Sequence, residues 1–344
     1  MTGSGPAARK PLPGGPLRRL AARVLPHPVK QAVKKRLTGT RWFPPPPVRT
    51  ARPPAPRKLV VGLPDAPGGG PTPAPLSIEC PKYMFIPYKL EESGLGAYEP
   101  FGLDCFLALV EAAPPGAVFD IGANVGLYGL LASAYSDRVV HCFEPAPDTA
   151  GVARATAAAN GLDVTVAEIA LGNDTGRATL YLSDSTDSSN SLNPDFRPHS
   201  GEIDVPVETI DDYVARTGVV PSLIKIDTET TEPEVLAGAV KTIRDHRPWI
   251  MTEVLWSLVE DRLHDVMDEY GYSYYHLNGP GPREAAERIV GDSTWTYYMF
   301  LMAPEPVNDA FWDRMNDWRA ALDRSTISTP DTASSDTASS DTAS

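Results

Sequence analysis

The sequence of 344 residues has little cysteine and no long apolar run. Its three cysteines, Cys80, Cys105 and Cys142, are odd in number and have no metal-ligand spacing, so we predict no disulfide framework and no metal site. No stretch approaches the ~20 consecutive apolar residues of a membrane-spanning helix, and the N-terminus lacks the apolar segment of a signal peptide. We therefore expect buried, reduced thiols in a cytoplasmic protein.

Acidic residues are missing from the N-terminal region. None occurs before Asp65, whereas residues 9–58 contain 14 of the 31 lysines and arginines. The rest of the chain, residues 59–344, has 17 basic and 44 acidic residues. Because binding of nucleic acid needs local positive charge, this acidic part of the chain argues against a nucleic-acid substrate.

Composition divides the chain into four parts. Residues 1–76, rich in proline and basic residues, predict a mostly disordered leader. Residues 77–305 predict the catalytic domain, residues 306–327 a C-terminal helix, and residues 328–344, which repeat Asp-Thr-Ala-Ser-Ser, a disordered tail. Within the leader, residues 16–38 alternate apolar and basic positions. Such a segment can make peripheral contact with an anionic membrane, and the alternative is a solvated tail.

Strand-like and helix-like segments alternate between residues 117 and 302. Alternation of this kind predicts an α/β fold with a mostly parallel sheet and helices on both faces. Seven strands are expected in that sheet, with the last one antiparallel: 117–121, 139–143, 164–171, 223–226, 249–254, 273–277 and 294–302. A further antiparallel strand is expected at 177–182.

The first of these strands runs into a glycine turn that opens a helix. Gly122 and Gly126 let the backbone approach a ligand closely, and ligands in such sheets bind beyond the carboxyl ends of the strands. The spacing is G-x-x-x-G and differs from the G-x-G-x-x-G of dinucleotide-binding proteins. Asp120, directly before the turn, suits a cationic amino group, as in a sulfonium amino acid. Ala123 and Asn124 complete the predicted binding turn.

Acidic residues follow the next two strands. Glu144, followed by Pro145, stands where an acid accepts hydrogen bonds from ribose hydroxyls, and Glu168 is placed to face an adenine. Together with the glycine turn they predict a nucleoside-binding site. Three alternatives stay open: a nucleotide-binding oxidoreductase, a non-catalytic Rossmann-like scaffold, and a tight turn with a surface acid.

A second acidic group follows the later strands. Asp227 and Glu253 end adjacent strands, and Glu229 lies in the loop between them, so each is a candidate to orient or deprotonate an acceptor hydroxyl. The alternatives are that Asp227 caps a helix, or that Asp227 and Glu253 hold Mg²⁺. Glu232 is interpreted as an ordinary acid in the first turn of a helix.

These motifs resemble the FkbM family of methyltransferases over residues 101–277. The resemblance is carried by Phe119–Gly126, Phe143–Pro145, Ala170–Asn173 with Gly176, and Ile224–Asp227 with Glu229, Glu232, Val235, Leu236 and Gly238. It implies a class I methyltransferase fold, S-adenosylmethionine as cofactor, and O-methylation of a sugar, glycolipid or secondary metabolite.

The resemblance also assigns roles and contains one departure. It implies that Asp120 and the glycine turn hold the amino-acid end of the cofactor and that Glu144 holds the ribose. Asp227 is the first candidate for the base, followed by Glu229 and Glu253. The family usually has Gly-Ala between its two glutamates, where this chain has Thr230-Thr231. Since threonine replaces glycine easily only at negative φ, a different loop shape is expected.

Overall fold

The computed structural model describes residues 56–329. The predictions of a disordered leader up to residue 55, of a membrane-contacting segment at 16–38, and of a repetitive tail from 330 onward lie outside the described residues. In the part of the chain described, no helix is long and apolar enough to cross a membrane.

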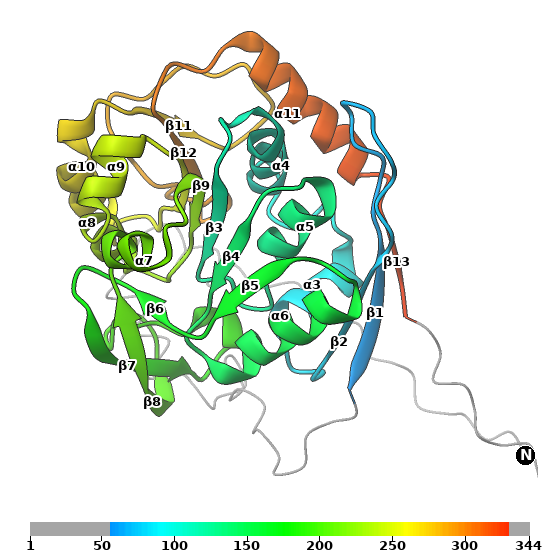
Figure 1. Cartoon of the computed structure of the whole chain (residues 1–344), viewed down its shortest axis with the longest axis horizontal. Coiled ribbons are helices and arrows are strands. Elements are labelled where there is room, and N and C mark those ends of the chain that lie inside the picture. The colour runs from blue at the N-terminus through cyan, green and yellow to red at the C-terminus, as the bar shows by residue number, and fades with distance from the viewer. Residues whose placement is uncertain (1–55, 330–344) are drawn as a thin grey trace, which may run out of the picture. The chain divides into compact units, whose positions relative to one another are not determined.

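The centre of the described structure is a seven-stranded sheet of order β11-β12-β10-β9-β3-β4-β5 (Figure 1). Its strands are β3 (Ala117–Ile121), β4 (Val140–Phe143), β5 (Val164–Ala167), β9 (Pro221–Ile226), β10 (Trp249–Glu253), β11 (Ser273–His276) and β12 (Met299–Ala303). All neighbours pair in parallel except β12, which is antiparallel to both β10 and β11. The predicted fold class, a mostly parallel sheet with an antiparallel last strand, is confirmed.

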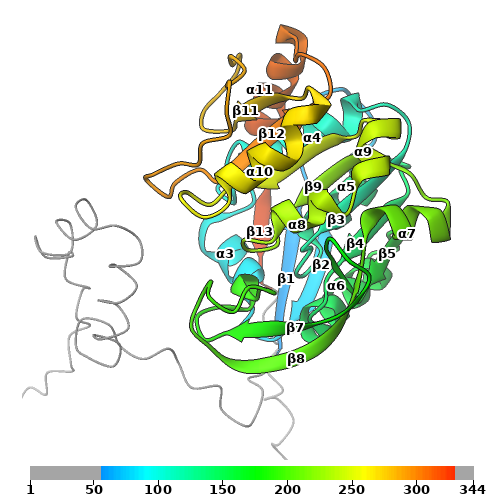
Figure 2. The same ribbon diagram turned by 90° about the vertical axis from the view of Figure 1, so that its left-hand side faces the viewer.

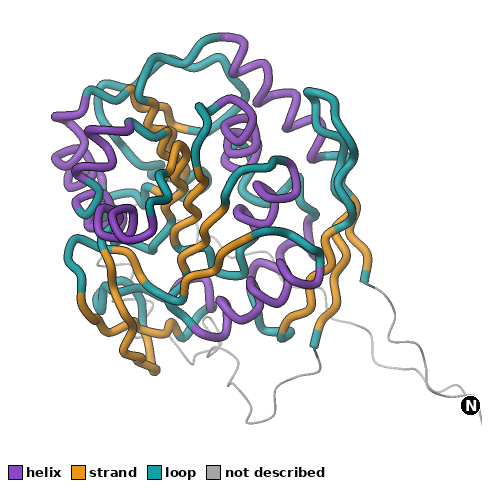
Figure 3. The backbone as a smooth tube through the Cα atoms, viewed as in Figure 1, coloured by secondary structure: helices purple, strands orange, loops and turns teal. Residues whose placement is uncertain are grey.

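Helices cover both faces of this sheet (Figure 3). Successive strand residues point to opposite faces, so Val118 joins one core and Phe119 the other. The first core includes residues of α3 (Phe85–Ser93), α4 (Gly102–Ala112), α5 (Leu127–Tyr135), α6 (Pro147–Ala159) and α11 (Asp309–Leu322). The second includes residues of α7 (Ile210–Thr217), α8 (Glu232–Ala237), α9 (Val240–His246) and α10 (Glu260–Met267). Almost every residue of the inner strands β3, β4, β9, β10 and β12 is buried, which explains their largely apolar sequences.

The folded unit extends beyond the predicted domain at both ends. A three-stranded antiparallel sheet of order β13-β1-β2 joins β1 (Arg57–Gly62), β2 (Leu76–Cys80) and β13 (Thr326–Ser328). The predicted leader boundary at residue 76 is therefore wrong, because Leu59 and Val61 pack in the core despite their proline-rich surroundings. Residues 306–327, which were predicted as a C-terminal helix, contain α11 and then enter β13.

A second small sheet, of order β6-β8-β7, lies at one end of the described fold (Figure 2). It contains β6 (Ala170–Leu171), β7 (Gly176–Ser183) and β8 (His199–Glu208), and β7 and β8 form an antiparallel pair. The strand predicted at 164–171 is thus divided between two sheets, and β8 was not predicted. The loop between β7 and β8 contains the 3-10 turn η1 (Asp187–Ser189). This loop takes part in the site described next.

Candidate active site

A cavity of about 520 Å³ lies at the carboxyl ends of β3, β4, β9 and β10. This is the edge at which open α/β sheets bind their ligands, and the volume is typical of a small-molecule site. Three segments distant in sequence complete its walls: helix α3, the loop between β7 and β8, and the segment before β12. The sequence predicted the sheet edge but not these three covering segments.

The glycine turn forms one wall of the cavity. Gly122 has φ of 72°, and a Cβ there would collide with the carbonyl oxygen of Asp227. The N–H groups of Gly122 and Ala123 both donate to the carbonyl of Phe143, each at 3.0 Å. Gly122, Ala123 and Asn124 line the cavity as predicted. No side chain fits at Gly122, so the glycine lets the turn pack against the backbone of Asp227 at the end of β9 while the turn lines the cavity.

Gly126 was predicted to let the backbone approach a ligand, but it lies away from the cavity. It has φ of 79° and begins α5, and a Cβ there would lie 3.1 Å from the Cβ of Ala153 in α6. It is not among the residues that line the cavity. Its lack of a side chain lets α5 start close to α6, so its role is in packing.

Asp120 also differs from its prediction, because it lies one layer beneath the cavity. Its side chain is fully buried, and its Oδ2 accepts a hydrogen bond from the N–H of Gly129 in α5 at 2.9 Å. Its Oδ1 lies 3.7 Å from Lys225 Nζ. Burial raises the pKa of Asp120, and the Lys225 ammonium lowers it. Asp120 thus fixes α5 and Lys225 and does not line the cavity itself.

Glu144 lies on the cavity wall beside the glycine turn. Its two carboxylate oxygens accept hydrogen bonds from the N–H groups of Asn124 and Ala146, at 2.8 and 2.9 Å. Burial raises the pKa of Glu144 to about 7. Each carboxylate oxygen has a further lone pair, so the side chain is held in place and still able to accept from a ligand hydroxyl. Pro145 also lines the cavity.

Glu168 does not reach this cavity, which corrects its predicted contact with an adenine. Strand β5 ends at Ala167, and the chain then leaves the central sheet to form β6. Glu168 instead forms an ion pair with Arg154 of α6 at 2.6 Å, with both side chains exposed.

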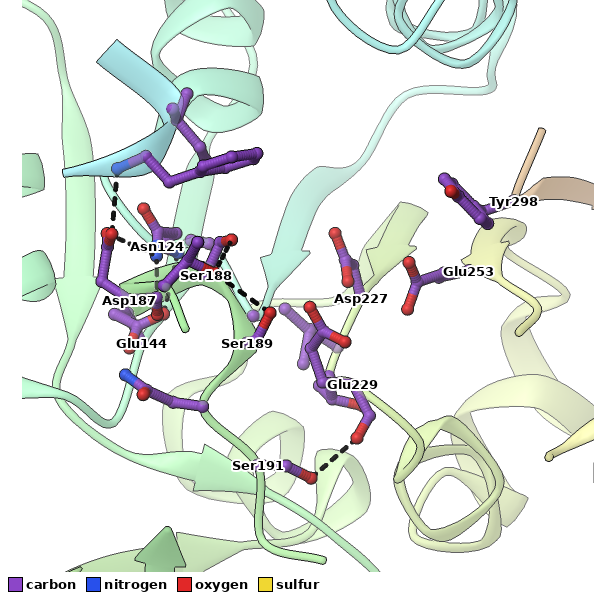
Figure 4. A pocket seen from close by; sticks show the side chains of 18 of the residues that line it. Asn124, Glu144, Asp187, Ser188, Ser189, Ser191, Asp227, Glu229, Glu253 and Tyr298 are labelled. Carbon is purple, nitrogen blue, oxygen red and sulfur yellow. Dashed lines mark hydrogen bonds between the residues drawn. The ribbon is translucent and has the colours of Figure 1, made fainter. Parts of the chain in front are cut away.

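The three predicted acids of the later strands converge in the cavity. Asp227 follows β9, Glu253 ends β10 and Glu229 lies in the loop after β9, and Figure 4 shows their carboxylates pointing toward one another. Burial, together with the neighbouring Asp227, raises the pKa of Glu229 and of Glu253 well above the usual range. Glu253 Oε2 is buried and has no hydrogen-bond partner among residues 56–329.

A lysine that the motif analysis passed over lies between these acids. Lys225 Nζ is 3.2 Å from Asp227 Oδ2, and it lies 5.0 Å from the ring centroid of Tyr128. Burial lowers the pKa of Lys225, but Asp227 and Asp120 raise it by more, so the side chain is an ammonium. A lysine in an otherwise apolar buried strand was the available signal, because buried charges need partners.

Glu99 is a further acid that sequence reasoning missed. It lies between α3 and α4, lines the cavity and accepts a hydrogen bond from the Tyr128 hydroxyl at 2.7 Å. Burial and the charge of Asp227 raise the pKa of Glu99, while Lys225 lowers it. Nothing in the local sequence places this residue at the sheet edge, which lies far from it along the chain.

The comparisons with known proteins agree with this geometry. Residues 120–274 match the family described as the methyltransferase FkbM domain. Over these residues the chain is similar to the FkbM methyltransferases. It is 29% identical over 210 residues to the 31-O-demethyl-FK506 methyltransferase FkbM of Streptomyces tacrolimicus, a match that covers 52% of this chain and 77% of that protein. The resemblance inferred from the motifs is therefore confirmed.

Two solved structures are also similar to this chain. One is methyltransferase FkbM from Methylobacillus flagellatus KT, with a TM-score of 0.35, 16% identity, and coverage of 55% of this chain and 43% of that chain. The other is precorrin-6y C5,15-methyltransferase from Geobacter metallireducens GS-15, with a TM-score of 0.37, 12% identity, and coverage of 65% and 93%. This chain thus spans less than half of the length of the first structure.

The loop between β7 and β8 covers the cavity of the FkbM domain. The N–H of Phe85 in α3 donates to Asp187 Oδ1 at 2.9 Å. At the other end of the loop, Ser191 Oγ donates to the carbonyl of Glu229 at 2.7 Å, and Asn193 Nδ2 donates to Thr230 Oγ1 at 2.9 Å. The loop is thereby tied both to α3 and to the loop that carries Glu229.

Thr230, which stands where the family usually has glycine, lies in a loop with positive φ angles. Glu229 and Thr230 have φ of 56° and 89°, so Thr230 adopts a backbone conformation that favours glycine. Glu232 Oε1 supports the loop by accepting from the N–H groups of Thr228 and Thr230, at 2.9 and 3.1 Å. Glu232 lies in the first turn of α8, as predicted.

The three cysteines and the possible metal ligands lie within the described residues. All three cysteines are free and buried, and burial raises the pKa of the Cys80 thiol to about 11. Within residues 56–329, no group of three or more His, Cys, Asp or Glu side chains is placed to hold a metal ion.

Proposed function

We propose that the domain transfers a methyl group from S-adenosylmethionine to a hydroxyl oxygen of a sugar, glycolipid or secondary metabolite. The observation that carries this proposal is the juxtaposition, in one cavity, of the glycine turn and Glu144 with the carboxylates of Asp227, Glu229 and Glu253. The first pair suits an adenosyl amino acid, and the acidic group suits a cationic methyl donor and an acceptor that must lose a proton.

The residues present fit such a cofactor. Gly122, Ala123 and Asn124 of the glycine turn line the cavity, and Glu144 has lone pairs available for ribose hydroxyls. The glycine turn would hold the amino-acid end, and Asp120 would contribute indirectly, through α5 and Lys225. The bound cofactor supplies a methyl group on a positively charged sulfur.

Two acids of the cavity, Glu253 and Asp227, have different roles toward the acceptor. Glu253 Oε2 is buried and has no hydrogen-bond donor among the described residues, so it is placed to accept the proton of an acceptor hydroxyl. Asp227 already accepts from Lys225, so it is suited to orient the acceptor. The bound cofactor would supply the methyl group, with its carbon–sulfur bond breaking as the bond to the acceptor oxygen forms, and Glu253 would take the proton of that hydroxyl. This assignment reverses the order expected from the sequence, in which Asp227 came first.

Oxygen as the acceptor atom is supported by the relative from Streptomyces tacrolimicus. That protein is named as a methyltransferase of a 31-O-demethyl compound. Hydroxyls are weak nucleophiles until a base removes the proton, and a carboxylate group of this kind meets that need.

The first experiment is calorimetric titration with S-adenosylhomocysteine. We expect micromolar binding by the wild-type protein, and a loss of about tenfold or more in Glu144→Ala, because two buried backbone N–H groups and the ribose lose their acceptor. Glu168→Ala is the matched control, since Glu168 lies outside the cavity and should leave the affinity unchanged.

Two outcomes would contradict the proposal. Absence of binding by folded wild-type protein would favour a non-catalytic scaffold. If Glu168→Ala weakened binding as much as Glu144→Ala, the cofactor would lie elsewhere. A mass shift of one methyl group on an alcohol, lost in Glu253→Gln while cofactor binding persists, would establish O-methylation.

A further inference from the structure

Two polar atoms at the cavity lack partners of their own. Arg197 Nε and Glu253 Oε2 are both buried, and neither has a hydrogen-bond partner among residues 56–329. Both residues line the cavity, Arg197 from the loop before β8 and Glu253 from the end of β10. Because buried polar groups are normally hydrogen-bonded, two orphaned atoms in one cavity indicate that a ligand satisfies them.

The guanidinium of Arg197 is held near the acids without being neutralised by one. Its central carbon lies 4.6 Å from the ring centroid of Phe196, which is itself buried. Its charge lowers the pKa of Glu229, against the larger effects of burial and Asp227, so it faces the acidic group. No ion pair of Arg197 occurs within the part of the chain that the structure describes. Its buried Nε–H therefore remains available to a bound molecule.

The charges that line the cavity restrict what that molecule can be. Six acidic and three basic residues line it, and two of the bases, Lys89 and Lys225, are already paired with Glu92 and Asp227. An anionic ligand would meet this excess of carboxylates, and an ammonium group beside Arg197 would meet a like charge. A neutral ligand rich in oxygen avoids both penalties.

Hydrogen-bonding capacity narrows the choice further. A guanidinium only donates, and an ionised carboxylate only accepts. A ligand that satisfies both Arg197 and Glu253 must offer an acceptor to the first and a donor to the second. Two oxygens on neighbouring carbons do so, since a hydroxyl both donates and accepts.

We propose that Arg197 is a specificity-determining residue that binds the oxygen next to the hydroxyl that is methylated, so that the acceptors are vicinal diols or alcohols with an oxygen on the adjacent carbon. This inference rests on the proposed O-methyl transfer, in which Glu253 takes the proton of the reacting hydroxyl. Tyr298, which Figure 4 shows beside Glu253, offers a ring surface for the carbon skeleton of such an acceptor.

The test uses the full chain saturated with S-adenosylhomocysteine and a family of simple probes. Dissociation constants are measured by ligand-observed NMR for methyl α-glucopyranoside, its monodeoxy analogues and methyl glucuronide. The variants are Arg197→Met, which removes the guanidinium N–H donors, and Arg197→Lys, which keeps the positive charge but loses the planar guanidinium. Arg177→Met is the matched control, because Arg177 lies on the preceding strand, pairs with Asp204 and does not line this cavity.

We expect the wild-type protein to bind the intact glycoside about tenfold more tightly than at least one monodeoxy analogue. Arg197→Met should remove this difference by weakening the glycoside alone, and Arg197→Lys should retain part of it. Arg177→Met should behave as wild type. Unchanged affinity for S-adenosylhomocysteine in every variant shows that the fold and the cofactor site are intact. If Arg197→Met loses this affinity, the comparison of glycoside and deoxy analogues is made with Arg197→Lys instead.

Several results would overturn the proposal. Equal affinity of the wild-type protein for the glycoside and all its deoxy analogues would do so, as would a deoxy penalty that survives in Arg197→Met. Tighter binding of the glucuronide, lost in Arg197→Met, would make Arg197 an anion site. If the protein binds S-adenosylhomocysteine but none of the probes, the diol assignment is wrong and the proposed methyl transfer still stands. If the wild-type protein does not bind S-adenosylhomocysteine, the proposed methyl transfer itself is wrong.

Discussion

The ammonium of Lys225 lies 3.2 Å from the carboxylate of Asp227, two residues further along the chain. Residues at i and i+2 of an extended segment face the same side, and Asp227 directly follows β9, so its side chain lies on the same side as that of Lys225. There the same ammonium lies 3.7 Å from Asp120 of the adjacent strand β3. The buried ammonium of Lys225 thus forms ion pairs with two carboxylates.

Replacement of Lys225 by Met should destabilise the protein severely. Asp120 and Asp227 would remain close together without a cation, and breaking such a buried group costs about 3 kcal/mol or more. Adding Asp120→Asn should restore part of the loss, because only one acid then remains. The control is Lys89→Met, a cavity lysine with an exposed partner, which should leave the free energy of unfolding nearly unchanged. Urea denaturation measures all three, and a double variant no more stable than Lys225→Met alone would refute this account.

Replacement of Glu253 by Gln should raise stability at high pH while it lowers turnover. The pKa of Glu253 is raised in the folded state, so between its unfolded and folded pKa values the native protein binds more protons than the unfolded chain. The free energy of unfolding therefore falls as the pH rises through this window, and Gln removes the effect. We expect a gain of about 1 kcal/mol at pH 8 and almost none at pH 4.

The pH series for Glu253→Gln needs an exposed acid for comparison. Glu287→Gln serves, since Glu287 is exposed in the loop before β12, and it should be neutral at both pH values. A Glu253→Gln variant less stable than the wild type at pH 8 would show that the carboxylate has a stabilising partner in the folded protein.

Replacement of Gly122 by Ala should abolish cofactor binding and destabilise the fold by about 3 kcal/mol or more. The added Cβ would collide with the backbone of Asp227 at a positive φ, and neither backbone can move without distorting a buried strand end. Gly151→Ala is the comparison: Gly151 lies within α6, and no heavy atom lies within 4 Å of a Cβ there. It should gain about 0.5–1 kcal/mol. Thermal unfolding distinguishes the two, and a Gly122→Ala variant of wild-type stability would contradict the close approach.

A pair of substitutions at Thr230 should isolate the strain in its loop. Thr230→Ala and Thr230→Gly both remove the hydrogen bond from Asn193, but only Gly suits a φ of 89°. We expect the Gly variant to be more stable than the Ala variant by about 1 kcal/mol. At the neighbouring Thr231, where φ is −110°, the order should be reversed. The same order at both positions would remove the argument for strain.

The sequence alone determined the parts of this protein that depend on local pattern. The segment from Ala117 to Tyr135, strand then glycine turn then helix, was predicted correctly because a continuous apolar run, a positive-φ glycine and helical spacing are each readable within a few residues. The mostly parallel sheet followed from the alternation of strand-like and helix-like segments. The acids Glu144, Asp227, Glu229 and Glu253 were found because strand ends of a parallel sheet meet at one edge.

Only the tertiary structure decided which side chains face the cavity and what covers it. Asp120 was predicted at the ligand and lies beneath it, because the packing of α5 draws its carboxylate inward. Glu168 turns to the surface where its chain leaves the central sheet. Glu99, Arg197 and Tyr298 reach the site from segments distant in sequence. The direction of a side chain and the meeting of remote segments depend on long-range packing, which no local pattern encodes.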